Sequence, residues 1–343
     1  MEITMKGIEM TTVYNIAVAP NKSYVKYMYV LMESLFETNR DKKICFYILY
    51  NELDEKDCSR IEMFVKKNGA ECRFIYIDKA VFANFPMEER FSVEAYFRLA
   101  VQDVIPTGVD KLLYLDCDMI VINDIEELYQ ENLEGKYFAA CGFSPRCESG
   151  GDFNSGMLLF DMKRMREDIT LDTYRILTQK MEKDFYLDQA LLNEQFAKDG
   201  VKYVWKQKYN FTCPFYRKYK KQVQKELPDY SMEDIVIVHF AGPGIRPWQM
   251  RMGAKELKRL DQKNLLEVFA ASGYLLDELY IGFLERWWKF AEKTPDYEQV
   301  LSDMQQKKNE IFTEVLMNVV CSKEYTMGHR LLRIPRKIKG LFR

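Results

Sequence analysis

The sequence predicts an α/β protein in which a sheet is flanked by helices and followed by a helical C-terminal extension. Short apolar segments alternate with segments of helical periodicity over residues 13–120, and this alternation is typical of parallel strands joined by right-handed crossovers. Residues 112–115 are apolar without polar alternation, which indicates a strand covered on both faces. From about residue 253 onward the pattern is helical throughout. The 343 residues suffice for one large α/β domain with an appendage, or for two domains.

The first part of the chain supplies the predicted elements in strict alternation. Each apolar segment is followed by a turn and then by apolar residues at helical spacing. Gly69 closes the second helix, because glycine readily adopts the backbone conformation that ends a helix. The expected strands are residues 14–19, 44–50, 72–77 and 112–115, and the expected helices are residues 24–38, 54–68 and 92–104.

The pattern changes after Ile120, where the apolar segments become shorter. A loop rich in Gly, Ser, Pro and Cys separates the first two of them. We expect strands at residues 138–142, 157–160, 201–205 and 235–239, and helices at residues 165–182 and 187–196. The predicted organisation is a disordered leader (1–12), an α/β domain (13–252) and a helical region (253–343) that ends in a basic amphipathic tail.

The composition excludes several classes of protein. The net charge of −2 gives no overall attraction to nucleic acid. The eight cysteines include no CxxC pair, which favours reduced thiols in a cytoplasmic protein over a disulfide framework. No apolar run has membrane-spanning length, and the first residues lack the apolar core of a signal peptide. We therefore expect a cytoplasmic protein that binds no nucleic acid.

Asp116 and Asp118 directly follow the apolar strand at residues 112–115. Side chains two residues apart point to the same side of an extended chain, so the two carboxylates can converge. Like charges repel unless a cation lies between them, and ligands of open α/β sheets bind beyond the carboxyl ends of the strands. The motif predicts a divalent metal site. The alternative is that the two carboxylates bind no metal and only cap loop amides.

His239 ends a second apolar strand and precedes a Gly-Pro-Gly turn and Arg246. A lone histidine is most often a packed or surface residue, but glycines permit close backbone approach to a ligand and arginine suits a phosphate. One imidazole with two carboxylates fits Mn²⁺ better than Mg²⁺, which keeps oxygen ligands and waters. The set lacks the second histidine or the thiolates that would suggest a zinc or non-haem iron site.

Two short polar segments, residues 152–156 and Asp188-Gln189, adjoin an apolar strand and an apolar helix. Taken alone, they indicate a β-turn and a helix N-cap. The alternative interpretation is that their short polar side chains face the hydroxyls of a sugar.

Several segments together resemble the family 8 glycosyltransferases, which are retaining galactosyl- and glucosyltransferases. The resemblance runs from about Tyr14 to Trp248, and the order and spacing of the segments make it specific. The matching segments are 15–19, 96–98, 113–118, 153–156, Asp188-Gln189 with Asn193, 239–242 and 246–248.

The resemblance implies a GT-A fold with a mixed sheet, a UDP-glucose or UDP-galactose donor, and Mn²⁺, with Mg²⁺ as the alternative. It implies transfer to a glycan or glycolipid acceptor in bacterial lipopolysaccharide or cell-surface glycan synthesis. Asp116, Asp118 and His239 would bind the metal. Asn154, Asp188 and Gln189 would form the catalytic group that holds the transferred sugar. The residues expected to bind the donor are Ala19, Asn21, Arg98, Asp116, Cys117, Gly242 and Arg246.

Two positions depart from the family pattern. Asn21 stands where an acidic residue often meets the uracil, and Arg246 replaces a lysine with a longer spacer before it. For a retaining transfer we favour front-face attack, in which the leaving phosphate accepts the proton from the acceptor, because Gln189 is a poor nucleophile. The alternative is a covalent intermediate, for which Asp188 is the nearest carboxylate to Gln189.

The last fifteen residues, 329–343, hold six Lys or Arg residues and no acidic residue. They predict either a peripheral contact with anionic lipid at the inner face of the plasma membrane, or a tail that is disordered or packed on the domain.

Two rival functions remain open at this point. A haloacid-dehalogenase-type phosphatase would use Asp116 as its nucleophile, and a catalytically dead scaffold would only bind the sugar nucleotide.

Overall fold

A computed structural model of the chain describes residues 12–87, 92–142, 152–181, 187–212, 220–221, 223–225, 228–241, 246–249 and 278–306. The predicted loop at 144–151, the tail at 329–343 and almost all of the predicted leader lie outside these ranges. Within the described ranges, no helix is long and apolar enough to cross a membrane.

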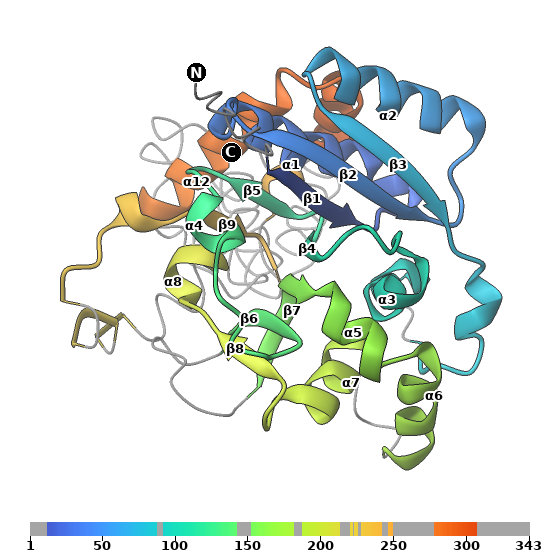
Figure 1. The fold of residues 1–343 in the computed structure, drawn as a ribbon. Helices are drawn as coiled ribbons and strands as arrows, with labels where there is room; N and C mark the ends of the chain where they lie inside the picture. Colours follow the sequence, from blue (N-terminus) through green and yellow to red (C-terminus); the bar gives the residue numbers. More distant parts are fainter. Residues whose placement is uncertain are drawn as a thin grey trace, which may run out of the picture. The chain divides into compact units, whose positions relative to one another are not determined.

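Seven strands form the central sheet in the order β3-β2-β1-β4-β7-β6-β8 (Figure 1). The first four of these strands are parallel, β7 is antiparallel to both β4 and β6, and β8 is parallel to β6. The sheet is therefore mixed, and the predicted α/β class is confirmed. The bounds are β1 Val13–Val18, β2 Lys43–Tyr50, β3 Glu71–Tyr76, β4 Lys111–Leu115, β6 Phe138–Gly142, β7 Phe153–Asp161 and β8 Val201–Tyr203.

The strand directions bring distant segments to one edge of this sheet. Leu115 at the end of β4 pairs with Met157 near the start of β7. Cys141 near the end of β6 pairs with Asn154 in β7. Residues 116–118 and 153–156 therefore meet beyond the carboxyl end of β4, where ligands of open α/β sheets bind.

A separate two-stranded sheet begins directly after Asp118. β5 (Met119–Val121) pairs antiparallel with β9 (Ile237–His239), and Met119 is opposite His239 in this register. The sequence pattern predicted β9 but not β5, because three residues carry no periodic signal. This pairing returns His239 to the two aspartates.

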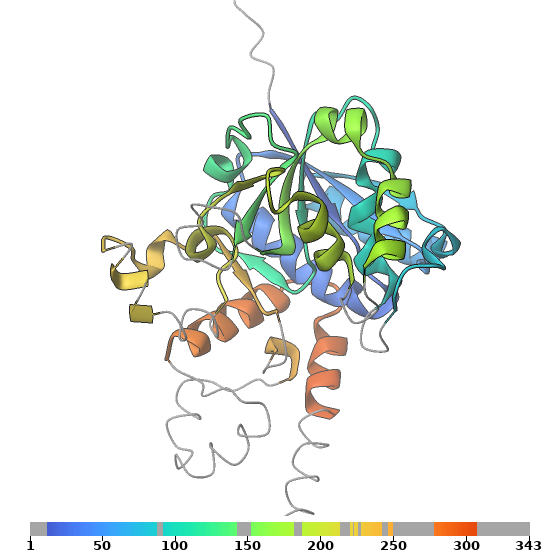
Figure 2. The ribbon, with the colours of Figure 1, turned by 90° about the horizontal axis from the view of Figure 1, so that it is seen from below.

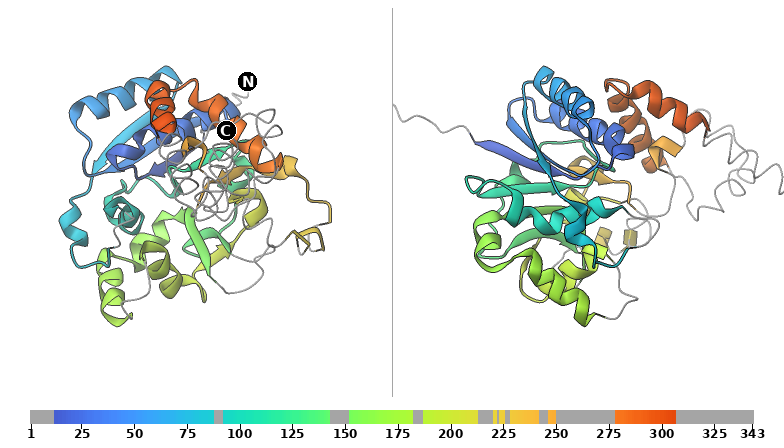
Figure 3. Two further views of the ribbon diagram at one scale, coloured as in Figure 1. Left: turned by 180° about the vertical axis from the view of Figure 1, so that it is seen from behind. Right: turned by 90° about the vertical axis from the view of Figure 1, so that its right-hand side faces the viewer.

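Helices cover both faces of the central sheet (Figure 2, Figure 3). Asp54 begins α2 with a capping box, in which its side chain accepts a hydrogen bond from the backbone N–H of Asp57. In the described residues, the α-helices are α1 Val25–Thr38, α2 Glu55–Lys67, α3 Val101–Val104, α4 Glu126–Tyr129, α5 Met162–Asp168, α6 Leu171–Lys180, α7 Leu187–Phe196, α8 Lys206–Tyr209 and α12 Glu278–Ala291. The 3-10 helices are η1 Lys22–Tyr24, η2 Lys79–Phe82, η3 Val93–Ala100, η4 Met232–Asp234 and η5 Pro247–Gln249.

Two predicted helices differ from the observed ones. Residues 92–104 form the 3-10 helix η3 followed by one turn of α-helix, α3, rather than a single α-helix. Residues 165–182 contain parts of two helices, because Thr170 adopts extended backbone and forms the capping box of α6. A polar residue that caps a new helix can override a continuous helical pattern.

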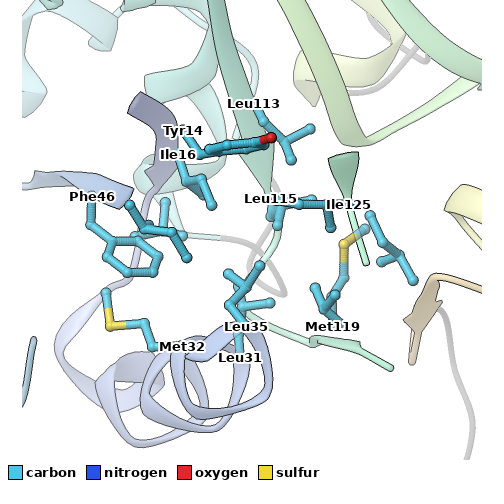
Figure 4. Packing of buried hydrophobic residues seen from close by; sticks show 14 of the residues in the cluster. Tyr14, Ile16, Leu31, Met32, Leu35, Phe46, Leu113, Leu115, Met119 and Ile125 are labelled. Atoms are coloured by element: carbon cyan, nitrogen blue, oxygen red, sulfur yellow. The ribbon is translucent and has the colours of Figure 1, made fainter. Parts of the chain in front are cut away.

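The core has two apolar layers, one on each face of the sheet. Leu113 and Leu115 of β4 point into one layer and Leu112 and Tyr114 into the other. This confirms that the strand at 112–115 is covered on both faces. Figure 4 shows part of the first layer, where residues of α1 pack against β1, β2, β4 and β5.

The chain divides into two compact units, residues 1–241 with 289–295, and residues 242–288 with 296–343. In the second unit, the described residues include η5, most of α12 and a helical stretch at 297–306. The Trp248 and Trp287 rings pack with their centroids 5.6 Å apart there. The predicted domain boundary near residue 252 stays a prediction.

Candidate active site

The turn that carries Asp116 and Asp118 is held by backbone hydrogen bonds on both sides. The N–H of Asp116 donates to the carbonyl of Gly156 in β7 at 2.9 Å, and the N–H of Phe240 donates to the carbonyl of Asp118 at 2.9 Å. The turn is therefore fixed between the start of β7 and the end of β9. The backbone that carries the two carboxylates is therefore held in place on both sides.

Asp116, Asp118 and His239 form a cluster in which one ligand atom from each lies within 4.8 Å of the others. His239 Nε2 is 3.1 Å from Asp118 Oδ1 and 3.8 Å from Asp116 Oδ2. His239 and Asp118 are buried, whereas Asp116 is partly exposed, so the cluster is reached by solvent mainly from the side of Asp116. The structure thus brings together the three residues that the sequence predicts as metal ligands.

Gly156 borders the same space. A methyl group added to it would lie 2.5 Å from His239 Cε1, 2.7 Å from Asp116 Oδ2 and 3.0 Å from Asn154 Oδ1. Any larger residue would therefore push the three side chains apart or fill the space between them. Glycine keeps this space open, and two carboxylates with one imidazole around it suit a divalent cation.

Arg98 of η3 bridges Asp116 of the cluster to Asp188 of α7. Its Nη2 is 2.7 Å from Asp116 Oδ1, and its Nε is 3.1 Å from Asp188 Oδ2. Its Nη1 donates to the carbonyl of Ser155, and its guanidinium lies 4.5 Å from the centroid of the Tyr114 ring. Arg98 is therefore fully engaged with the protein, and its predicted contact with donor phosphate and sugar stays a prediction.

The charges around Arg98 explain its protonation. Burial alone would lower the pKa of the guanidinium, but Asp116 and Asp188 outweigh it and raise the pKa above its usual range. Burial also raises the pKa of Asp188, against the opposing effect of Arg98. A buried guanidinium between two carboxylates must hold both anions in place.

Arg98→Met is expected to lower the free energy of unfolding by about 3–5 kcal/mol, because it leaves Asp116 and Asp188 without their buried partner. Urea denaturation measures the change. Lys66→Met is the matched control, since it removes an ion pair with Glu62 in which both side chains are largely exposed; we expect a loss of less than about 1 kcal/mol there. Equal losses in the two variants would contradict a structural role for the Arg98 bridge.

The predicted sugar-binding residues adjoin the metal cluster. Asn154 lies within β7 rather than in a turn, and its Nδ2 donates to Gln189 Oε1 at 3.0 Å. Ser155 Oγ donates to Asp188 Oδ2 at 2.8 Å. Leu187, just before Asp188, has a φ of 59°, an uncommon conformation for a residue with a side chain. Such strain often occurs where a side chain must be aimed at a functional site.

The other predicted donor contacts lie at the ends of β1 and β4 or outside the first unit. Asn21 caps η1, because its Oδ1 accepts a hydrogen bond from the N–H of Tyr24 at 2.9 Å. Ala19 follows β1 and is partly exposed, whereas Cys117 packs into the core and burial raises its thiol pKa well above its usual range. Gly242 lies outside the described residues. Arg246 belongs to the second unit, where it lies over the Trp248 ring.

Sequence reasoning missed one residue of this site, Asn210. It follows α8, is fully buried, and its Oδ1 lies 2.9 Å from His239 Nδ1. Its Nδ2 donates to Asn154 Oδ1 at 2.8 Å. No motif marks this asparagine, so only the fold could reveal it.

Comparison with known proteins relates these residues to a family. The sequence profile described as Glycosyl transferase family 8 matches residues 15–252. The chain is 22% identical over 250 residues to a lipopolysaccharide 1,2-glucosyltransferase of Escherichia coli, with 68% of this chain and 73% of that protein covered. It is 25% identical over 256 residues to a lipopolysaccharide 1,3-galactosyltransferase of Salmonella typhimurium strain LT2, again with 68% and 73% covered.

A solved structure shows the same fold. The galactosyltransferase LgtC, in complex with donor and acceptor sugar analogues, superposes with a TM-score of 0.63 at 22% identity, and 82% of this chain and 96% of that chain are covered. A similarity of this degree supports a shared fold and nothing further. The predicted GT-A fold is confirmed by it.

Proposed function

The chain belongs to glycosyl transferase family 8, and on that premise we propose that it transfers a hexose from UDP-glucose or UDP-galactose to a hydroxyl of a glycan or glycolipid. The observation that carries this proposal is the convergence of Asp116, Asp118 and His239 beside Asn154 and Gln189. Metal ligands and polar side chains suited to sugar hydroxyls then share one edge of the sheet. Membership of this family also disfavours the rival phosphatase interpretation of Asp116.

The charges of the site support a divalent cation. Among the described residues of the site, Asp116 and Asp188 pair with the guanidinium of Arg98, and the carboxylate of Asp118 lies beside His239. A divalent cation would balance the remaining negative charge, and the imidazole of His239 favours Mn²⁺ over Mg²⁺. When bound, the metal would supply Lewis-acid stabilisation of the charge that develops on the leaving UDP.

The hydrogen bonds of the sugar side support front-face attack over a covalent intermediate. Gln189 Oε1 already accepts from Asn154 Nδ2 at 3.0 Å and from the N–H of Ser155 at 3.3 Å, so it is a poor nucleophile. Asp188 Oδ2 accepts from Ser155 Oγ and pairs with Arg98, which restrains it as well. A glycosyl adduct on Asp188, detected by mass spectrometry, would overturn this preference.

The names of the relatives guide the choice of acceptor. Both of the similar proteins described above are named as lipopolysaccharide hexosyltransferases. We therefore propose an acceptor glycan of the bacterial cell surface, modified at the cytoplasmic side. The predicted membrane contact through residues 329–343 would suit a lipid-linked acceptor.

Donor hydrolysis tests the proposal directly. We expect release of UDP from UDP-glucose or UDP-galactose in the presence of Mn²⁺, and no release once a chelator is added. GDP-mannose serves as the control donor for nucleotide selectivity. The transferase proposal fails if both UDP-sugars stay intact and UDP does not bind. Binding of UDP without hydrolysis or transfer would favour the dead scaffold.

A further inference from the structure

Three side-chain amides connect the metal cluster to the sugar side. His239 Nδ1 lies 2.9 Å from Asn210 Oδ1, and Asn210 Nδ2 lies 2.8 Å from Asn154 Oδ1. Asn154 Nδ2 in turn lies 3.0 Å from Gln189 Oε1. The direction of this chain follows only with support from groups that can act solely as donors or solely as acceptors.

Two backbone N–H groups supply that support, because a backbone N–H can only donate. The N–H of Gly156 is 3.1 Å from Asn154 Oδ1, which must therefore be an oxygen. The N–H of Ser155 is 3.3 Å from Gln189 Oε1, which fixes the amide of Gln189 in the same way. The two amides fixed in this way, Asn154 and Gln189, agree on one polarity.

The direction of these hydrogen bonds also determines which nitrogen of the His239 imidazole donates to Asn210. Since Asn154 Oδ1 accepts from Asn210, the nitrogen of Asn210 faces Asn154 and its oxygen faces His239. An amide oxygen only accepts, so His239 Nδ1 must carry a proton. The Nε2 atom is then the one that faces Asp118 and Asp116.

We infer that Asn210 is a positioning residue that sets the proton on Nδ1 of His239 and thereby aims its Nε2 at the metal cluster. The inference rests on the proposed function for the identity of the metal, but the direction of the hydrogen bonds stands without it. A partner on the second nitrogen of a histidine ligand commonly fixes its tautomer and orientation.

The backbone holds Asn210 at this position. The N–H of Phe211 donates to the carbonyl of Ile237, and the N–H of His239 donates to the carbonyl of Phe211, both within 2.9 Å. The residue before Phe211 is thus kept beside β9. Asn210 is fully buried, so water is poorly placed to replace its amide.

Nuclear magnetic resonance of ¹⁵N-labelled histidine tests the proton position without metal, donor or activity. The chain has only two histidines, His239 and His329, so one substitution at His329 assigns both signals. We expect a proton on Nδ1 of His239 that is protected from exchange in the wild type and loses this protection in Asn210→Ala. An unprotonated Nδ1 in the wild type would overturn the inference.

Mn²⁺ affinity in the presence of UDP tests the consequence for the site. We expect Asn210→Ala to weaken binding by about 10-fold to 100-fold, the usual effect of losing such a partner. Asn210→Asp keeps an oxygen acceptor for Nδ1, so it should bind Mn²⁺ much more tightly than Asn210→Ala. Asn123→Ala is the matched control, because Asn123 Nδ2 donates to the carbonyls of Glu233 and Ile235 just before β9 and does not touch His239.

The outcomes separate the inference from the proposed function. Wild-type affinity in both Asn210 variants, or an equal loss in both, would overturn the positioning role. A loss of the same size in Asn123→Ala would assign the effect to general loosening of β9 and would also overturn it. If the wild type binds no Mn²⁺ with UDP, the metal part of the proposed function fails, and the histidine signals still decide the role of Asn210.

Discussion

Asp118→Asn is expected to lower kcat/KM for the UDP-sugar by about 10²-fold to 10³-fold, the loss typical of removing one group that stabilises transition-state charge. The amide keeps the size of the carboxylate and removes its charge, so packing changes little. His239 Nε2 lies 3.1 Å from Asp118 Oδ1 and serves the same cluster. His239→Ala should therefore cause a loss of similar size.

The double variant of Asp118 and His239 is the sharper test. If the two residues hold one cation, the first substitution already empties the site and the second adds little, so the combined loss should match the larger single loss. Mn²⁺ titration and steady-state kinetics measure the effect in parallel. Asp172→Asn, in an exposed ion pair with Arg175, is the control and should retain activity. Losses that multiply in the double variant would mean that Asp118 and His239 act separately.

Gly156→Ala is expected to reduce Mn²⁺ binding and activity as strongly as the loss of a ligand. The new methyl group would lie 2.5 Å from His239 Cε1 and 2.7 Å from Asp116 Oδ2, well inside normal contact distance. The backbone has little freedom to retreat, because the carbonyl of Gly156 accepts from the N–H of Asp116 and its own N–H donates to Asn154. The side chains of the metal cluster must move instead.

Gly108→Ala is the matched control for this substitution. A methyl group at Gly108 meets nothing within 4 Å, so we expect wild-type kinetics and Mn²⁺ affinity. Urea denaturation of both variants separates a local effect on the site from a general loss of stability. Wild-type Mn²⁺ affinity in Gly156→Ala would show that the cation does not occupy the space between His239 and Asp116.

Much of the fold followed from sequence periodicity. The apolar strand at 112–115 lies between two apolar layers, as its lack of alternation predicted. The split of residues 165–182 into α5 and α6 was not predicted, because the capping box of Thr170 is a local choice that competes with a continuous helical pattern. β5 was not predicted because its three residues form a strand only through their pairing with β9.

The candidate metal ligands could be proposed from the sequence because each follows or ends an apolar strand, and strand ends are where such side chains can converge. Their partners could not. Arg98 matched a donor contact by resemblance, yet in the fold its guanidinium is occupied by Asp116 and Asp188. Nothing in the sequence around Asn210 distinguishes it from any other buried polar residue.

The sequence by itself thus determined the class of fold, the family, and Asp116, Asp118 and His239 as candidate ligands, since periodicity and motif order are local properties of the chain. Only the tertiary structure decided which groups surround those ligands. Gly156, Arg98 and Asn210 act through contacts between segments far apart in the sequence, and the distances that make them matter exist only once β4 pairs with β7 and β5 pairs with β9. Hydrogen bonds and steric contacts depend on such distances, and sequence spacing does not encode them.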